Sequence, residues 1–348
     1  MLRDYFISIM KDQRRTFDGR IVGMFLSAIS FVYLGILTLI YWMYKTRLLS
    51  PCRVKPKVIS VGNLTLGGTG KTPFTITLTE KVVRMGKRPA VLIRGYGDDE
   101  PHMLRDRLRE IPVLVGADRV RNADIAYREQ GSLCVILDDG FQHRRIHRDL
   151  DIVLVDASSP FDNTRIFPRG TLREPLSRLK DAQVAVVTKA DMEPAATRRI
   201  CEVIRRINRE IDIVQSHYEA VGLCDVFSQK EVHLSYLKGR KVLLLAGIAN
   251  PAYFEWMVRR LNCNIVGSIF YSDHYPYKPT DIRGIAKRCL ECDARTVVTT
   301  EKDAVRLRRD LKSYEGVDFL ALKIDCRLSK NEEKIDVRLS SVFDSQVL

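Results

Sequence analysis

The longest apolar stretch of the chain runs from Ile21 to Tyr44 and contains no charged residue. As an α-helix at about 1.5 Å per residue, these 24 residues reach roughly 36 Å, against about 30 Å for the hydrocarbon core of a bilayer. Tyr41 and Trp42 lie near one end of it, where amphipathic rings prefer the lipid headgroups. A buried core helix usually keeps a polar stripe, which we do not find here, and a cleavable signal peptide is shorter. The pattern favours a membrane anchor over both.

Basic residues flank this apolar stretch on both sides. They include Arg14, Arg15 and Arg20 before it, and Lys45, Arg47, Arg53, Lys55 and Lys57 after it. The excess after the stretch predicts that the large domain lies on the cytoplasmic side of the membrane. The same flanks would suit a helix that dips into one leaflet and returns both ends to an anionic surface, so spanning and monotopic anchors both stay open.

Beyond Pro56, short runs of apolar residues alternate with segments long enough for helices. The predicted strands are Val58–Val61, Ala90–Ile93, Val113–Val115, Leu133–Leu137, Ile152–Val155 and Val184–Thr188. Apolar runs that do not alternate with polar residues, and that are separated by amphipathic stretches, indicate a parallel sheet covered by helices on both faces.

The same pattern resumes in the last third of the chain. Further strands are predicted at Val242–Ala246, Ile265–Ile269, Thr296–Thr299 and Phe319–Leu322, with helices after Asn250-Pro251, after Pro279 and from Glu301. Proline suits the first turn of a helix. We therefore expect an anchor over residues 1–50, a nucleotide-binding lobe over 51–235 and a smaller α/β lobe over 236–348, with the active site in a cleft between the lobes.

Composition narrows the function classes. The 348 residues are 45% hydrophobic and 29% charged, which suits globular domains, and 57 basic against 43 acidic residues leave a net charge of +14. This surplus favours anionic partners, namely phosphorylated substrates, anionic lipid or nucleic acid. The eight cysteines form no disulfide framework, and the pair Cys289 and Cys292 lacks the second pair of a zinc site.

A glycine-rich loop follows the first predicted strand. It reads Gly62-Asn63-Leu64-Thr65-Leu66-Gly67-Gly68-Thr69-Gly70-Lys71-Thr72, and a helix is predicted from about Pro73. Backbone N–H groups of such a loop cradle phosphates, a lysine reaches the outer phosphates and a Thr hydroxyl ligates Mg²⁺. The strict phosphate-loop pattern has glycine where Thr65 stands, so this is a variant of it. Because strand, loop and helix come in the required order, we favour a P-loop NTPase-like fold.

Two further segments lie at the ends of predicted strands. Asp138 and Asp139 follow an apolar strand, which is where a carboxylate that holds Mg²⁺ is found in P-loop proteins. Thr188-Lys189-Ala190-Asp191 resembles a variant of the guanine-reading motif of GTPases. The second signal is short, and an ordinary turn between strand and helix explains it equally well. It keeps a P-loop GTPase or metallochaperone-like switch as the alternative function.

Several segments together resemble the tetraacyldisaccharide 4'-kinase family, the membrane-bound lipid A 4'-kinases. They are Val58–Leu64, Gly67–Thr72, Arg94–Gly97, Asp99-Glu100-Pro101, Asp118-Arg119, Leu137–Arg144, Pro168-Arg169-Gly170, Leu172–Pro175, Asp273-His274-Tyr275 and Thr299–Asp303. The resemblance runs in one order from the anchor to about residue 325. Members of this family, as the resemblance implies, phosphorylate the 4'-hydroxyl of a lipid A disaccharide 1-phosphate with ATP, at the cytoplasmic face of a bacterial inner membrane.

The resemblance also implies roles for individual residues. Those near the nucleotide are Gly67, Gly68, Thr69, Gly70, Lys71 and Thr72 in the loop, Arg94 and Arg119 as phosphate clamps, and Thr72, Asp138 and Glu174 at Mg²⁺. Asp99 would be the base that receives or orients the attacking hydroxyl, His274 its partner, and Lys71 and Asp139 further catalytic groups. These groups suffice for phosphoryl transfer, which requires mainly positioning and charge neutralisation.

One departure from the family concerns the stretch before Asp99. Family members carry an extra segment between the two motifs here, whereas Asp98 follows Gly97 directly in this chain. The partners we expect are the lipid substrate and anionic inner-membrane lipids, with the protein a monomer and no nucleic acid bound. A nucleic-acid-binding ATPase would account for the charge alone and would leave the apolar anchor unexplained.

Overall fold

The computed structural model describes residues 2–10, 12, 16–95, 97, 99–159, 161, 164–308 and 316–344. The chain forms two compact units, which consist of residues 1–94, 112–217 and 328–348, and of residues 95–111 and 218–327. The sequence predicts a single crossing between lobes near residue 236, whereas the chain passes between the units four times. Residues 95–111 belong to the second unit because residues 99–107 form a helix that packs on a helix from the last third of the chain.

The first unit is built on a parallel sheet with the strand order β3-β2-β4-β1-β5-β6-β7. Its strands are β1 (Lys57–Asn63), β2 (Pro89–Ile93), β3 (Val113–Val115), β4 (Cys134–Asp138), β5 (Leu150–Asp156), β6 (Val184–Thr188) and β7 (Asp212–Asp225). The first six match the strands predicted from the sequence within two residues at either end. β1 lies between β4 and β5, so the glycine-rich loop leaves the sheet near its middle.

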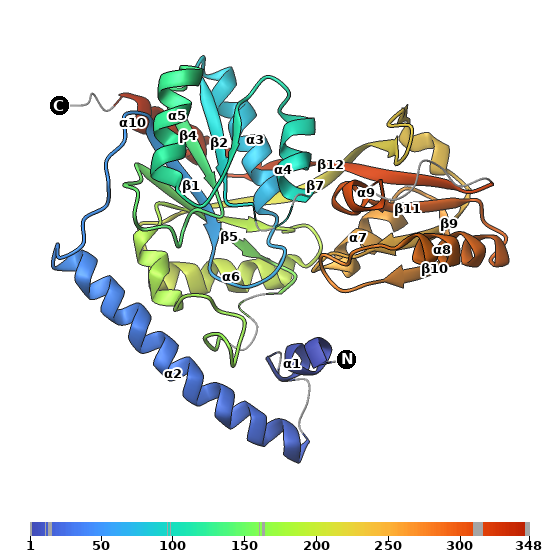
Figure 1. Ribbon diagram of the computed structural model, residues 1–348, viewed down its shortest axis with the longest axis horizontal. Coiled ribbons are helices and arrows are strands. Elements are labelled where there is room, and N and C mark those ends of the chain that lie inside the picture. Colours follow the sequence, from blue (N-terminus) through green and yellow to red (C-terminus); the bar gives the residue numbers. More distant parts are fainter. Residues whose placement is uncertain are drawn as a thin grey trace. The chain divides into compact units, whose positions relative to one another are not determined.

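Helices cover both faces of this sheet (Figure 1). They are α3 (Lys71–Arg84), α5 (Arg119–Gln130), α6 (Pro194–Ile207), α10 (Glu332–Asp344) and the short 3-10 helix η1 (Leu176–Asp181). α5 and α6 share one face, because the strand residues they pack on are in register across β1. The crossovers through α3 and α5 run in opposite directions along the sheet, and right-handed crossovers therefore place them on opposite faces.

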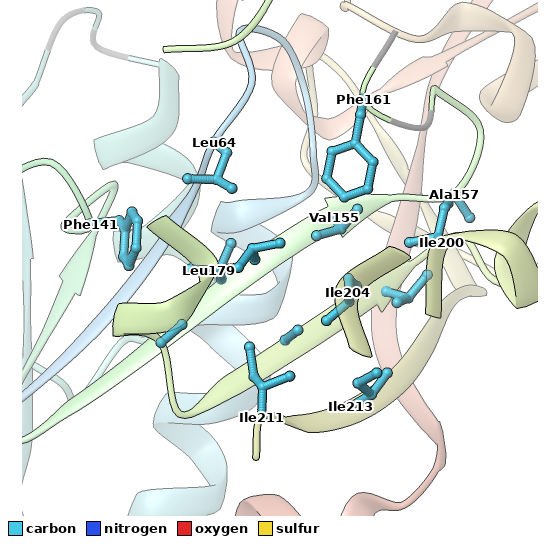
Figure 2. Packing of buried hydrophobic residues seen from close by; sticks show 14 of the residues in the cluster. Leu64, Phe141, Val155, Ala157, Phe161, Leu179, Ile200, Ile204, Ile211 and Ile213 are labelled. Atoms are coloured by element: carbon cyan, nitrogen blue, oxygen red, sulfur yellow. The ribbon is translucent and has the colours of Figure 1, made fainter. Parts of the chain in front are cut away.

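The core under α6 shows how this unit is held together (Figure 2). Ile200 and Ile204, one turn apart on α6, pack against Val155 and against side chains of β6 and β7. Leu64 and Phe141 extend the same cluster to the loops after β1 and β4. These loops are thus anchored in the apolar core, and fully burying such a side chain contributes about 1.5–3 kcal/mol.

The predicted anchor forms one long helix. α2 spans Phe17–Lys45 and is preceded by the short helix α1 (Leu2–Met10). α2 is long and apolar enough to cross a membrane, and only 17% of its most apolar stretch is buried. The flanking Arg14 and Arg15 lie outside the described residues.

The strands of the second unit continue the same 12-stranded sheet beyond β7, in the order β7-β12-β11-β9-β10. Its elements are β8 (Glu231–Val232), β9 (Lys241–Ala246), β10 (Asn264–Phe270), β11 (Thr296–Thr300) and β12 (Asp318–Lys330), with α4 (Asp99–Arg107), α7 (Pro251–Arg259), α8 (Pro279–Glu291), α9 (Glu301–Leu307) and the 3-10 helix η2 (Leu234–Leu237). β9, β11 and β12 pair in parallel, and α8 and α9 pack on them. The predicted second α/β lobe is confirmed.

Two long strands differ from the prediction. β7 was not predicted at all, and β12 extends eight residues beyond the predicted end at Leu322. Each strand runs from one compact unit into the other. The half-buried Gln215 and His217 and the exposed Glu219 interrupt the apolar pattern of β7, because a strand that leaves a core loses the continuous burial that marks it in the sequence.

Candidate active site

The loop after β1 is held in shape by its neighbours. Gly67 and Gly70 adopt positive φ angles of 113° and 85°, which explains the need for glycine at both positions. The Asn63 side chain donates to the Thr65 carbonyl and the Thr69 hydroxyl. Thr65 also bridges to Leu172, so the residue that departs from the strict phosphate-loop pattern pins the loop to a neighbouring segment.

The start of α3 completes this loop. Lys71 and Thr72 are the first two residues of the helix, so its positive end and the free N–H groups of its first turn lie directly behind the loop. Gly62 is close to the loop after β4, since a Cβ there would come within 2.5 Å of the Phe141 Cβ. The predicted nucleotide residues Gly67, Gly68, Thr69, Gly70, Lys71 and Thr72 therefore form one continuous loop at the N-terminus of a helix.

Asp139 lies among cations. The Lys71 Nζ is 3.6 Å from its Oδ1, and an Arg173 nitrogen lies 2.9 Å and 3.2 Å from its two oxygens. Burial raises the pKa of Asp139, but the charges of Lys71, Arg173 and Arg119 outweigh burial and lower it below the ordinary value. Asp139 also adopts a φ of 56°, which is rare for a residue with a side chain and is concentrated at functional sites.

Asp138, the neighbour of Asp139, contacts the first turn of α3 instead. Its two carboxylate oxygens accept hydrogen bonds from the hydroxyls of Thr72 (3.1 Å) and Thr75 (3.2 Å). Its backbone carbonyl accepts a hydrogen bond from Arg119, which is 2% exposed. Thr72 and Asp138, which the resemblance assigns to Mg²⁺, thus lie within hydrogen-bonding distance of each other, and the buried Arg119 braces the strand end that carries Asp138.

Glu174 and Arg94 have different surroundings. Glu174 accepts a hydrogen bond from the Tyr41 hydroxyl of α2 (2.7 Å) and has Arg144 and Arg178 at 3.9 Å. In the part of the chain that the structure describes, no three His, Cys, Asp or Glu side chains gather as a metal site, so Glu174 does not join Asp138 and Asp139. Arg94 is exposed directly after β2.

The short motif Thr188–Asp191 contacts the glycine-rich loop. The Thr188 hydroxyl donates to the Thr69 carbonyl (3.0 Å), and the buried Lys189 ammonium donates to the Gly68 carbonyl (3.1 Å) and pairs with Asp156. Breaking a buried pair of this kind by removing one partner typically costs about 3–5 kcal/mol. These contacts give Thr188 and Lys189 a role in bracing the loop that requires no guanine.

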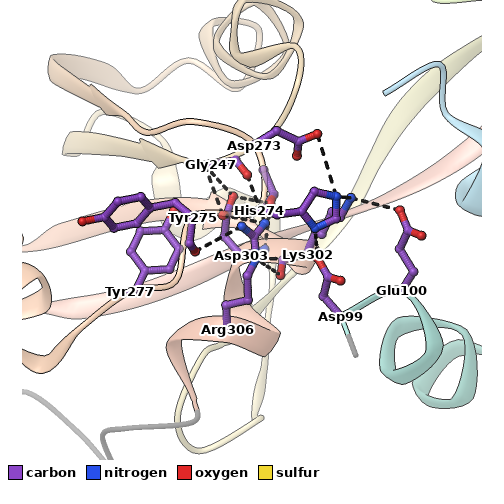
Figure 3. A network of polar contacts seen from close by, with 11 residues as sticks. Asp99, Glu100, Gly247, Asp273, His274, Tyr275, Tyr277, Lys302, Asp303 and Arg306 are labelled. Atoms are coloured by element: carbon purple, nitrogen blue, oxygen red, sulfur yellow. Dashed lines mark hydrogen bonds and ion pairs between the residues drawn. The ribbon is translucent and has the colours of Figure 1, made fainter. Parts of the chain in front are cut away.

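A second group of charged residues lies in the second unit (Figure 3). Asp99, the first residue of α4, is 3% exposed, and its Oδ2 lies 3.1 Å from the His274 Nδ1. The Lys302 Nζ lies 3.2 Å from the other ring nitrogen of His274 and donates to Glu100 (3.0 Å). Arg306 approaches Asp99 to 3.7 Å. The predicted partnership of Asp99 and His274 is therefore present.

Asp303 holds Arg306 of this group in position. Its buried carboxylate accepts hydrogen bonds from the Gly247 N–H (3.1 Å), the Tyr277 hydroxyl (2.9 Å) and Thr300 (2.7 Å), and pairs with Arg306 (3.0 Å). A Cβ on Gly247 would come within 2.9 Å of the Tyr277 oxygen, so only glycine leaves room here. Arg306 is thus held by Asp303 in the position from which it reaches Asp99.

The charges around Asp99 set its protonation. Burial raises the pKa of Asp99, but the hydrogen bond from His274 and the charges of Lys302, His274 and Arg306 lower it to about 2. The bond to Asp99 raises the pKa of His274, against burial and the charge of Lys302. Asp99 is therefore a carboxylate at neutral pH. Its hydrogen bond favours the charged form of the His274 imidazole, whereas the Lys302 ammonium, which can only donate, favours the neutral form. His274 is half exposed and adopts a φ of 60°.

Among the charged residues that the sequence-based list of site residues lacked are Arg173, Lys302 and Arg306. Arg173 and Lys302 lie in segments that resemble the family, so a signal for them was available. Arg306 carries no such signal, because its place beside Asp99 depends on the packing of α4 against α9. The stretch before Asp99 contains Tyr96 and Asp98, which lie outside the described residues.

Comparison with known proteins identifies the family of this chain. A model of the family described as tetraacyldisaccharide-1-P 4'-kinase matches residues 22–343. The tetraacyldisaccharide 4'-kinase of Halothermothrix orenii is 32% identical, with 94% of either chain covered, and that of Syntrophus aciditrophicus is 34% identical, with 84% of this chain and 86% of that protein covered. The crystal structure of LpxK from Aquifex aeolicus in complex with ATP aligns with a TM-score of 0.72 at 26% identity, over 92% of this chain and 99% of that one. The chain belongs to the tetraacyldisaccharide 4'-kinase family.

Proposed function

We propose that this protein transfers the γ-phosphate of ATP to the 4'-hydroxyl of a tetraacyldisaccharide 1-phosphate in lipid A biosynthesis. The observation that carries the proposal is the buried carboxylate of Asp99, held ionised beside His274 on a chain that also bears a complete phosphate loop. A protein that only switches between nucleotide states needs the loop, but it has no use for a second, buried proton acceptor.

The loop would hold the triphosphate. Backbone N–H groups from Gly67 to Gly70 and the N-terminus of α3 favour phosphate oxygens, and Lys71 adds a mobile positive charge. Arg94 is exposed and is a candidate clamp for the phosphates. The ATP bound to the Aquifex aeolicus relative supports this assignment. Asp139 pairs with Lys71 and would orient the ammonium group toward the nucleotide.

Thr72 and Asp138 fit a Mg²⁺ ion that accompanies ATP. Mg²⁺ prefers oxygen ligands, and a loop hydroxyl facing a carboxylate at a strand end is the usual arrangement in P-loop proteins. The two side chains lie 3.1 Å apart at their oxygens, on elements braced by Arg119 and by the core. When bound, the ion would neutralise charge on the phosphates. The contacts of Glu174 with α2 favour a structural role for this residue over metal ligation.

Asp99 would receive the proton of the attacking hydroxyl. As the 4'-oxygen forms its bond to the γ-phosphorus and the bond to ADP breaks, the hydroxyl proton passes to the Asp99 carboxylate. A group with a pKa of about 2 is a weak base, so its main contribution is to orient the hydroxyl and to accept the proton late in the step. His274, at 3.1 Å, would hold the carboxylate in place, and Lys302 would hold His274.

The membrane location follows from the substrate. A tetraacylated sugar remains in the bilayer, so its kinase has to work at that surface, and α2 is apolar enough to reach it. We place the catalytic body on the cytoplasmic face of the inner membrane, and the basic residues beside α2 together with the net charge of +14 favour contact with anionic lipid. We propose that the protein acts there as a monomer.

Incubating the full-length protein with labelled ATP and the disaccharide 1-phosphate tests this function. We expect label on the 4'-oxygen of the lipid and ADP in equal amount. Hydrolysis of ATP with no labelled lipid would contradict the proposal. Replacing ATP with GTP in the same assay tests the GTPase alternative, which we consider less well supported because Thr188 and Lys189 have structural contacts with the loop. A preference for GTP would favour the GTPase alternative.

A further inference from the structure

One face of α2 contacts the rest of the first unit along most of its length. The Ser30 hydroxyl donates to the Ile166 carbonyl (2.9 Å) and accepts from the Arg169 N–H (3.0 Å), and the Tyr33 hydroxyl donates to the Arg173 carbonyl (3.1 Å). The contacting residues are three, four or eight positions apart, so they lie on one stripe of the helix. They are Gly23, Leu26, Ser30, Tyr33 and Tyr41. The sequence indicated no polar stripe on this helix, and in this respect the prediction was wrong.

These contacts extend over a distance close to the thickness of a membrane. Gly23 packs on Arg169, since a Cβ there would lie 3.3 Å from its Nε, and Tyr41 lies under Arg144 at 3.9 Å and Arg178 at 4.2 Å from its ring centre. The eighteen residue-to-residue steps from Gly23 to Tyr41 correspond to about 27 Å of helix, against about 30 Å for the hydrocarbon core. If α2 crossed the bilayer in this arrangement, the segment beside it would have to lie in the hydrocarbon as well.

The segment beside α2 is unsuited to hydrocarbon. Residues 164–175 form no regular helix or strand, and lipid-exposed backbone of this kind does not occur at membrane depth, because its polar groups have no partners there. Arg169, Arg173 and Glu174 belong to this segment, and Arg144 and Arg178 flank it. A charged side chain at the bilayer centre costs at least about 2.5–3.5 kcal/mol. Several of them together exclude a spanning α2 that keeps these contacts.

The opposite face of α2 is apolar and exposed along the whole helix. Met24 is 74% exposed, Phe31 75% and Trp42 53%, and they lie on the side turned away from the bound stripe. The exposed apolar residues from this face are Phe17, Ile21, Met24, Phe25, Ile29, Phe31, Val32, Ile36, Leu39 and Trp42. Arg20 near the start of this face and Lys45 and Arg47 after its end are exposed and basic, which suits anionic headgroups at both ends.

We propose that α2 lies in the plane of the membrane, with its exposed face in one leaflet and its Gly23–Tyr41 stripe against the protein. This inference rests on the membrane location in the proposed function and specifies its geometry. The body of the first unit then stays at the headgroup level, and the partner of the exposed face is acyl chain rather than a second protein. The Tyr33 contact leads to Arg173, whose side chain pairs with Asp139, so the embedded helix directly backs the phosphate site.

The depth of three tryptophan positions tests this geometry. The chain has two tryptophans, so Trp256→Phe leaves Trp42 as the only reporter, and adding Trp42→Phe allows Met24→Trp or Phe31→Trp to report instead. Each full-length protein is bound to vesicles of phosphatidylethanolamine and phosphatidylglycerol that carry brominated acyl chains at shallow or deep positions. We expect all three reporters to be quenched most by shallow bromines, at equal depth.

Two results would overturn the proposal. Deep quenching at Phe31→Trp with shallow quenching at positions 24 and 42 indicates a spanning helix that has left the body. No quenching at any position indicates that another protein surface covers this face. The lipid kinase assay on the same vesicles is a separate readout, so a protein with the expected depths but no phosphate transfer would contradict the function and leave the geometry standing.

Two glycines of α2 offer a matched pair of variants. Gly23→Leu forces a side chain against Arg169, whereas Gly35→Leu adds the same side chain where nothing lies within 4 Å. Both substitutions favour the helix equally. We expect the Phe31→Trp reporter to move deeper in the Gly23→Leu protein, because the helix loses its fit to the body, and to stay at the parental depth in the Gly35→Leu protein. An equal response of the two variants would contradict the claim that the Gly23 stripe sets the orientation.

Discussion

The carboxylates of Asp139, which is half-buried, and of Asp99, which is buried, are both held in their charged form by neighbours, yet their surroundings differ. Asp139 faces Lys71 and Arg173, and the buried Arg119 also contributes positive charge. Asp99 lies among His274, Lys302 and Arg306, but Glu100 and Asp273 approach the same cations. The first site has a surplus of positive charge, and in the second the charges nearly balance.

This difference indicates how the chemistry is divided. A surplus of cations attracts an anion, so the site around Asp139 is suited to the phosphates of a nucleotide. A balanced cluster has little attraction for phosphate and instead holds one carboxylate in a defined position, ready to contact a neutral hydroxyl. The comparison predicts that substitutions at the two sites affect different kinetic constants.

Asp99→Asn is expected to have the largest effect. It removes the proton acceptor without changing the shape of the side chain, and kcat should fall about 10²–10⁴-fold while the KM for ATP changes little. Asp106→Asn, at an exposed residue of the same helix, is the matched control and should keep most of the activity. Steady-state kinetics with labelled ATP and the lipid measures both. Full turnover in the Asp99 variant would remove this residue from the mechanism.

Lys71→Ala is expected to reduce kcat by about 10²–10³-fold, because it removes one preorganised charge from the phosphates. In contrast to the Asp99 variant, it should also weaken ATP binding, which isothermal titration can measure. Lys81→Ala removes a lysine from the same helix that pairs instead with Glu332 and Asp336, and ATP affinity should be unchanged in this protein. Equal ATP affinity in both variants would contradict the assigned role of Lys71.

Lys302→Met is expected to lower kcat about tenfold, since one charge-assisted hydrogen bond contributes about 1.5 kcal/mol. The charge of Lys302 lowers the pKa of both Asp99 and His274, so its removal should raise both. The acidic limb of the pH–rate profile should therefore move to higher pH. Lys302→Arg keeps the charge and should restore the profile. An unchanged profile in the Met variant would mean that Lys302 is only a structural residue.

The smallest expected effect concerns the pH dependence of stability. The bond to Asp99 raises the pKa of His274 in the folded protein, so its stabilising contribution is complete below the unfolded pKa of about 6.5 and is lost as the pH rises through the folded pKa. The difference in unfolding free energy between the parent and His274→Gln should shrink from pH 6 to pH 8. Because His274 is half exposed, we expect this difference to change by less than about 1 kcal/mol between the two pH values. A difference that grows with pH would have the wrong sign.

The sequence alone determined the parts of this protein whose physics is local. The glycine-rich loop with Lys71, the buried strands on either side of it and the apolar run of α2 each lie in one continuous stretch, because backbone conformation, periodic burial and helix length are read over a few neighbouring residues. Family resemblance added Asp99 and His274, and the structure brings them within 3.1 Å. The strands of the first sheet could be predicted closely for the same reason.

Only the tertiary structure decided the features that depend on contacts between distant segments. Arg306 reaches Asp99 because α4 packs on a helix some two hundred residues later in the chain. Glu174 meets Tyr41 across 133 positions, and the polar stripe of α2 emerges only when its loop partner is present. The reason is that side-chain identity is fixed along the chain, whereas charge neutralisation and hydrogen bonding are satisfied by whichever groups folding brings within a few ångströms.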